Sequence, residues 1–187
     1  MGFGSAVQHA AFVLSDYLEH YCYDSIKDKY VLELGTGPGL VSITASLLGA
    51  QRVLATDGDV KLLQLTERNI SENVRDLFER GVISTKQLLW GETTHYDQIS
   101  PPVDVLLGAD IIACPYEHDF ENLVQTIRAL TDERSLVLLS YRRRSFKEDA
   151  CFEMLKQFFH VKMIDQAHVH ADFRESDICI FELQRLE

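Results

Sequence analysis

Apolar residues along this chain follow two spacings, short continuous runs and stripes that repeat at helical intervals. Runs bounded by turn residues are typical of buried strands, and stripes at i, i+3, i+4 and i+7 are typical of amphipathic helices. The runs predict strands at residues 30–34, 52–56, 82–90, 103–109, 135–141, 161–164 and 178–183. The stripes predict helices over residues 7–21, 40–49, 60–80, 120–130 and 145–159.

Strands and helices therefore alternate through the chain, a pattern typical of a parallel sheet covered by helices on both faces. We expect an α/β fold with a mostly parallel sheet, whose ligands bind at the carboxyl ends of the strands. The sequence has no internal repeat, low-complexity segment or linker. We therefore expect a single domain over residues 1–187, with a helical N-terminal segment, residues 1–29, packing on it.

Polar residues mark the expected starts of three helices. Asp59 and Asp119 each precede an apolar stripe, so each is predicted to cap a helix. Ser145 and Glu148 have the spacing of a capping box, in which the two side chains satisfy each other's backbone N–H groups.

The composition is that of a globular protein with a substantial core, since 46% of its 187 residues are hydrophobic and 25% are charged. No apolar run approaches the roughly 18 residues of a membrane-spanning helix, and the N-terminus lacks an export signal. We expect a cytoplasmic protein, and the nucleus stays open as a second location. The four cysteines form no C-x-x-C pair, so neither a disulfide framework nor a zinc site is indicated.

The charge balance points to protein partners rather than nucleic acid. A formal net charge of −11 repels phosphates, and the only dense basic run is 142–144, which we expect to be a solvated loop without a role. A protein partner with a basic or lysine-bearing surface fits this charge better. We expect a monomer, and no metal, because the seven histidines show no metal-binding spacing.

A glycine-rich turn follows the first predicted strand. Gly35, Gly37 and Gly39 alternate with Thr36 and Pro38 before the next helix begins. Glycines allow positive φ and a close approach of a ligand to the backbone. The spacing G-x-G-x-G differs from the G-x-G-x-x-G of dinucleotide-binding proteins. The turn is interpreted as a cofactor cradle; the alternative is an ordinary strand-to-helix turn whose glycines serve geometry alone.

Four side chains fall at or near the carboxyl ends of separate predicted strands: Glu33, Asp57, Trp90 and Asp110. Because the carboxyl ends of parallel strands meet at one edge of a sheet, we expect these residues to converge. Each has a simpler interpretation as well, since an acid at a strand end can cap a helix or face solvent, and a lone tryptophan is often part of the core.

Several segments resemble known methyltransferases. The glycine turn, with Glu33 before it and Asp57 after it, resembles motif I of the S-adenosylmethionine-dependent methyltransferases of the seven-strand class. Residues 88–91, 103–112, 120–127 and 136–142 resemble the methyltransferase-like family of protein-lysine methyltransferases known as family 16. The pairing of Trp90-Gly91 with Gly108-Ala109-Asp110 is the most restricted part of this resemblance.

The resemblance implies a Rossmann-like seven-strand fold, S-adenosyl-L-methionine as cofactor, and methylation of a lysine ε-amine on a protein such as a translation factor or a chaperone. It also implies a role for individual residues. Glu33 would receive the methionyl ammonium, Asp57 would accept both ribose hydroxyls, and Trp90 would lie beside the adenine. Gly35, Thr36, Gly37 and Gly39 would form the cofactor loop, Ala109 would lie beside the methionyl part, and Asp110 would draw in and orient the substrate amine.

The chain departs from the family pattern at two places. Gln8 stands where the family usually has a tryptophan, and Ala113 stands where the Asp-x-x-Tyr motif has its tyrosine. Counted back from the following helix, Tyr116 comes close to that tyrosine's place. Tyr116 is therefore predicted to be a second catalytic residue beside Asp110, and the alternative is a surface tyrosine in a loop.

Two other functions stay open from the residues alone. Cys114-Pro115-Tyr116 partly resembles the Asn/Asp-Pro-Pro-Tyr/Phe motif of enzymes that methylate nucleic acid bases. The first alternative is thus a methyltransferase acting on a base or a small molecule. The second is a non-catalytic cofactor-binding domain that serves as an interaction module.

Overall fold

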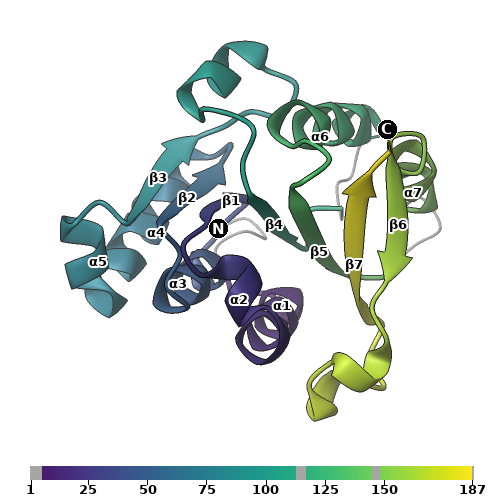
Figure 1. The fold of residues 1–187 in the computed structure, drawn as a ribbon, viewed down its shortest axis with the longest axis horizontal. Coiled ribbons are helices and arrows are strands. Elements are labelled where there is room, and N and C mark those ends of the chain that lie inside the picture. The colour runs from purple at the N-terminus through teal and green to yellow at the C-terminus, as the bar shows by residue number, and fades with distance from the viewer. Residues whose placement is uncertain (1–5, 113–116, 145–147, 187) are drawn as a thin grey trace.

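One sheet runs through the centre of the protein (Figure 1). The computed structural model describes residues 6–112, 117–144 and 148–186, and within them seven strands pair in the order β3-β2-β1-β4-β5-β7-β6. Neighbouring strands from β3 to β5 are parallel, whereas β7 runs antiparallel to both β5 and β6. The strands are β1 (Tyr30–Leu34), β2 (Arg52–Asp57), β3 (Ile83–Gln87), β4 (Val105–Ala109), β5 (Leu136–Arg142), β6 (Phe159–Met163) and β7 (Ile178–Arg185).

Helices cover both faces of this sheet, as expected for a Rossmann-like fold. In Figure 1, α1 to α3 lie below the sheet and α6 lies above it. Among the described residues, no helix is both long and apolar enough to span a bilayer. The helices are α1 (His9–Tyr21), α2 (Tyr23–Ile26), α3 (Leu40–Leu47), α4 (Val60–Asn73), α5 (Arg75–Glu79), α6 (Glu117–Leu130) and α7 (Glu148–Leu155).

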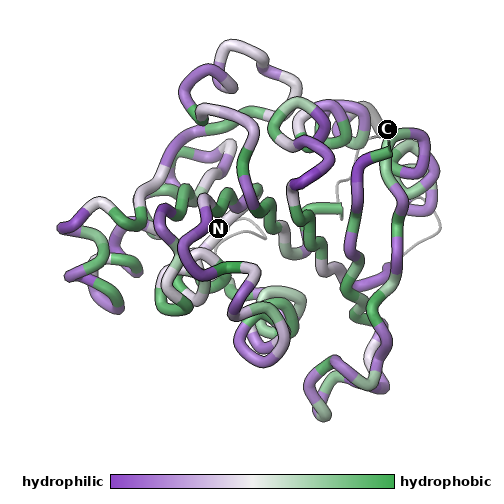
Figure 2. Tube along the Cα trace, viewed as in Figure 1, coloured by the Kyte–Doolittle hydropathy of each residue, from purple (hydrophilic) through white to green (hydrophobic). Residues whose placement is uncertain are grey.

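Alternate side chains of the central strands build two separate cores. In β1, Val31 faces the core that α1, α3 and α4 cover, and Leu32 faces the core that α6 and α7 cover. Both are fully buried, because a parallel strand with helices on both faces has no side in water. Figure 2 shows the resulting concentration of apolar residues along the central strands. This double burial is why the strands read as continuous apolar runs in the sequence.

The strand predictions are confirmed apart from their ends. The largest difference is β3, which was predicted to reach Trp90 but ends at Gln87. Gly91 takes a φ of 80°, a left-handed conformation that breaks extended structure. Trp90 consequently lies in the turn after the strand.

The predicted helix starts have different outcomes. Asp59 caps α4 as expected, because its Oδ1 accepts a hydrogen bond from the Lys61 N–H at 2.8 Å. The prediction for Asp119 is wrong, since α6 already begins at Glu117. Acids stabilise a helix both as caps and within its first turn, so the acid alone does not fix the boundary. Ser145 lies outside the described residues, and Glu148 begins α7 with its carboxylate accepting from the Arg144 N–H at 3.0 Å.

Candidate active site

A cavity of about 370 Å³ opens at the carboxyl ends of β1, β2 and β4, a volume within the range of small-molecule sites. Its wall comes from five parts of the chain: most of residues 6–11 at the N-terminus, most of residues 33–40 between β1 and α3, Asp57 at the end of β2, residues 109–111, and Arg144. The strand ends therefore meet as predicted. Of the predicted site residues, the wall includes Glu33, Gly35, Thr36, Gly37, Asp57, Ala109 and Asp110.

The glycine turn needs its first glycine. Gly35 has a φ of 65°, and a Cβ at this position would lie 2.7 Å from Cγ2 of Ile111. Any other residue would combine backbone strain with this clash. The turn thus packs its backbone directly against the segment after β4, which leaves its other side open to the cavity.

Helix α4 also fixes the glycine turn, through two side-chain hydrogen bonds. Thr66 donates its hydroxyl to the Gly37 carbonyl at 2.6 Å, and the Asn69 amide donates to the Pro38 carbonyl at 2.8 Å. Gly39 is not on the cavity wall; its role in the structure is to start α3 with a φ of 93°. A fixed glycine turn on the cavity wall suits close contact with a ligand.

Asp57 is anchored at the cavity by two backbone groups. Its Oδ2 accepts from the Gly37 N–H at 3.1 Å, and its Oδ1 accepts from the Asp59 N–H at 3.0 Å. A carboxylate oxygen can accept a second hydrogen bond. The oriented carboxylate therefore keeps free acceptor positions, which is what the predicted contact with two ribose hydroxyls requires.

Glu33 is buried beneath the glycine turn, with 1% of its surface exposed. Its Oε2 accepts from the Thr36 hydroxyl at 2.7 Å and from the N–H of Ser42 at 3.0 Å, and also from the Ser42 hydroxyl. Burial raises the pKa of Glu33 to about 7, and the nearby charge of Asp57 adds to this, whereas the hydrogen bonds oppose it. Oε1 has no donor within the described part of the chain, so a ligand ammonium in the cavity would stabilise the ionised carboxylate.

Glu33→Gln should flatten the dependence of stability on pH. The native state keeps the Glu33 proton up to about pH 7, whereas the unfolded chain loses it near 4.5. The unfolding free energy therefore falls as pH rises through this window, by about 3 kcal/mol for this residue. Urea unfolding at pH 4.5 and pH 8 should show a larger drop for the wild type than for the variant. Equal drops in both proteins would show that Glu33 is ionised in the native state at pH 4.5 and above.

Trp90 does not line the cavity. It packs at the edge of the core on the α6 side, and its Cζ2 lies 3.8 Å from where a Cβ of Gly35 would be. The Gly91 that follows donates its N–H to the Thr126 hydroxyl of α6 at 3.0 Å, and a Cβ there would overlap Asn122. The Trp-Gly pair thus has a packing role, and contact of Trp90 with adenine stays a prediction.

Asp110 projects from the end of β4 with an unusual backbone. Its φ is 61°, which is uncommon for a residue other than glycine, and its N–H donates to the Ser140 carbonyl of β5 at 2.7 Å. Only 8% of its side chain is exposed. The backbone is thus held by the neighbouring strand in a conformation that presents the carboxylate at the cavity wall.

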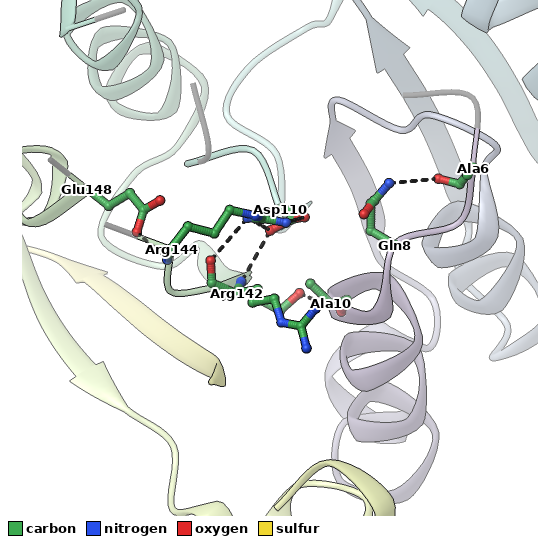
Figure 3. A network of polar contacts seen from close by, with 8 residues as sticks. Ala6, Gln8, Ala10, Asp110, Arg142, Arg144 and Glu148 are labelled. Carbon is green, nitrogen blue, oxygen red and sulfur yellow. Dashed lines mark hydrogen bonds and ion pairs between the residues drawn. The ribbon is translucent and has the colours of Figure 1, made fainter. Parts of the chain in front are cut away.

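The guanidinium of Arg144 forms an ion pair with this carboxylate (Figure 3). Arg144 donates Nη1 to Oδ1 of Asp110 at 2.8 Å and Nη2 to Oδ2 at 2.5 Å, and the Arg142 N–H donates to Oδ1 at 3.2 Å. The hydrogen bond to Asp110 raises the pKa of Arg144 above its ordinary value, so the arginine stays charged. Two-pronged pairs of this kind are among the stronger side-chain interactions.

Arg143 and Arg144 form an exposed loop directly after β5, as predicted, but the contact of Arg144 with Asp110 on the cavity wall was not predicted. Because β5 lies beside β4, the residues after β5 reach Asp110 directly. Arg143 instead pairs with Asp149 of α7 at 3.2 Å, away from the cavity wall. The local sequence does not show that β5 pairs with β4, so it does not predict which of the two arginines reaches Asp110. The position of the triplet just after a predicted strand did place it at the edge of the sheet where the site lies.

The N-terminal segment closes another side of the cavity. Gln8 and Ala11 lie on its wall, and Gln8 donates its amide to the Ala6 carbonyl at 3.3 Å. The Ser140 hydroxyl of β5 donates to the Ala10 carbonyl at 2.8 Å and so ties the start of α1 to the sheet. No residue of this segment was predicted to be a site residue. The predicted catalytic Tyr116 lies outside the described residues, so its role stays a prediction.

Comparisons with known proteins agree with this geometry. The sequence profile of a family described as lysine methyltransferase matches residues 1–158. The chain is 36% identical to the protein N-lysine methyltransferase METTL21A of Xenopus tropicalis, covering 98% of this chain and 79% of that protein. It is 35% identical to METTL21A of Mus musculus, covering 99% and 79%. Its fold is similar to the crystal structure of a TehB-like SAM-dependent methyltransferase from Corynebacterium glutamicum, with a TM-score of 0.67, 15% identity, and coverage of 92% and 88%.

Proposed function

Since the chain belongs to the lysine methyltransferase family and is an S-adenosylmethionine-dependent protein-lysine methyltransferase, we propose that Asp110 orients the substrate amine and that the substrates are translation factors or chaperones. The observation that carries the role of Asp110 is its place on the same cavity wall as the glycine turn. A methyl acceptor next to Asp110 is thereby close to a cofactor held by the turn.

The cavity fits the cofactor by its shape and by its donor set. The cavity has a volume of about 370 Å³, and two carboxylates on its wall, Glu33 and Asp57, suit an ammonium and a diol. When bound, S-adenosylmethionine supplies a methyl group on a cationic sulfur, so that an amine lone pair forms the nitrogen–carbon bond while the pair of the broken carbon–sulfur bond stays on sulfur.

The residues of the chain must deliver a neutral amine. A lysine has an ordinary pKa near 10.4, so at pH 7 only roughly one amine in a few thousand is neutral. The ammonium proton leaves to water before the reaction. Asp110 then accepts an N–H of the amine and turns its lone pair toward the glycine-turn side of the cavity, since alignment within about 3 to 3.5 Å accounts for much of the rate of such reactions.

The substrate class is tested by labelling a vertebrate cell extract with methyl-labelled S-adenosylmethionine. Wild-type enzyme should label a few polypeptides, and mass spectrometry should identify them as translation factors or chaperones that come from the cytosolic fraction. The net charge of −11 favours substrates whose lysine lies on a basic surface. Label confined to proteins of other classes would contradict the proposed substrates, but it would not contradict methyl transfer to lysine.

A further inference from the structure

The carboxylate expected to attract a lysine already holds a cation. A carboxylate has about four acceptor positions. Arg144 uses two of those on Asp110, and the Arg142 N–H uses a third. One position is left for a substrate amine, and the charge of the carboxylate is compensated.

This pairing bears directly on the protonation of the substrate. An uncompensated carboxylate within about 4 to 6 Å of an amine raises the amine pKa, and a nearby cation lowers it. An isolated Asp110 would bind lysine well but would keep it in the unreactive ammonium form. The Arg144 charge removes that penalty, while the hydrogen-bond acceptor that orients the amine remains.

We infer that Arg144 is a positioning residue of methyl transfer, which holds Asp110 as a charge-compensated acceptor so that lysine reacts as the neutral amine. The inference rests on the role proposed above for Asp110. Arg144 would thus act on the reaction through Asp110, without contacting the reacting atoms itself.

Further contacts show that Arg144 is built into this position. Its Nη1 also donates to the Arg142 carbonyl at 3.1 Å, and its backbone N–H donates to the buried carboxylate of Glu148 at 3.0 Å. If Arg144 only occupied the binding position of the substrate ammonium, its side chain would have to move away when lysine binds. These anchors favour an arginine that stays during the reaction.

Other charged groups lie near the pair, and apart from Arg143 in its own control variant they are the same in all the variants below. They are Arg142 at the end of β5, Arg143 after it, Glu148 and Asp149 of α7, and Glu33 and Asp57 on the same cavity wall.

The test measures methyl transfer by Arg144→Ala to the extract proteins that the wild type labels. At pH 7.5, the kcat of Arg144→Ala should fall about tenfold. Its KM, expressed as the concentration of extract protein, should also fall, because an uncompensated Asp110 carboxylate binds the lysine ammonium more tightly. The kcat deficit should shrink as pH rises toward 10, where the amine loses its proton in both enzymes. Arg144→Lys should recover part of kcat, since it returns the charge without the two-pronged geometry.

The matched control is Arg143→Ala, which removes a neighbouring arginine whose partner is Asp149 rather than Asp110. It should keep the wild-type kcat and KM. Cofactor affinity and thermal unfolding of each variant are measured alongside, and Arg144→Gln, which is closer in size, carries the same prediction if the alanine variant does not fold.

Two results would overturn the inference. A kcat deficit that is equal at every pH, with KM unchanged or higher, would reduce Arg144 to structural support. A kcat above the wild-type value would make it a competitor of the substrate. Failure of the proposed role of Asp110 looks different, because Asp110→Asn would then keep wild-type activity.

Discussion

Asp110→Asn should lower the rate of methyl transfer to protein by about 10²- to 10³-fold and leave cofactor affinity nearly unchanged. The amide keeps the shape of the side chain but loses its negative charge. The guanidinium of Arg144, paired with Asp110 at 2.5 Å in the wild type, would then face the incoming lysine without compensation. Loss of one oriented electrostatic contact in an enclosed site has effects of this size. Initial rates with labelled S-adenosylmethionine measure the loss, and calorimetry with the demethylated cofactor measures the affinity.

The control for this variant is Asp149→Asn. Asp149 also pairs with an arginine at the same edge of the protein, but it does not line the cavity. It should retain close to wild-type activity. Similar losses in both variants would mean that the ion pairs matter for stability and that Asp110 has no special part in the reaction.

Asp57→Ala should weaken binding of S-adenosylmethionine and of its demethylated product by about 10- to 100-fold. A hydrogen bond to a charged group contributes about 1.5–3 kcal/mol, and each 1.4 kcal/mol corresponds to a factor of ten in affinity. The substitution removes the acceptors for the ribose hydroxyls. It also releases the Gly37 N–H, which fixes the glycine turn against Asp57 in the wild type.

Asp59→Ala separates this effect from a loss of helix capping. Asp59 lies two residues further on and caps α4 through Lys61. Its replacement should cost about 1 kcal/mol of stability and leave affinity unchanged. Titration calorimetry on both variants decides the point. An unchanged affinity in Asp57→Ala would place the ribose elsewhere.

The sequence was sufficient to predict the parts of the site that follow directly from a strand. Glu33, Asp57 and Asp110 each come at or just after the end of a buried apolar run, and parallel strands bring such ends to one edge. Gly35 and Gly37 were recognisable because a strand that enters a tight turn needs positive φ. These features depend on local patterns that a few neighbouring residues determine.

The remaining features depend on which elements become neighbours. Arg144 reaches Asp110 only because β5 pairs with β4, and Gln8 reaches the wall only because α1 is tied to β5. The position of Trp90 depends on how its turn packs on α6, where Gly91 contacts Thr126. No periodicity within these segments encodes the pairing, so a basic triplet and a polar N-terminus looked like solvated surface.

The central claim is that this cavity methylates lysine in proteins, and acid hydrolysis of the labelled extract protein tests it most directly. After reaction with wild-type enzyme, the radioactive amino acid should co-migrate with mono-, di- or trimethyllysine, and the signal should be nearly absent with Asp110→Asn. Label that is removed by nuclease instead of protease, or that migrates with another methylated residue, would contradict the claim.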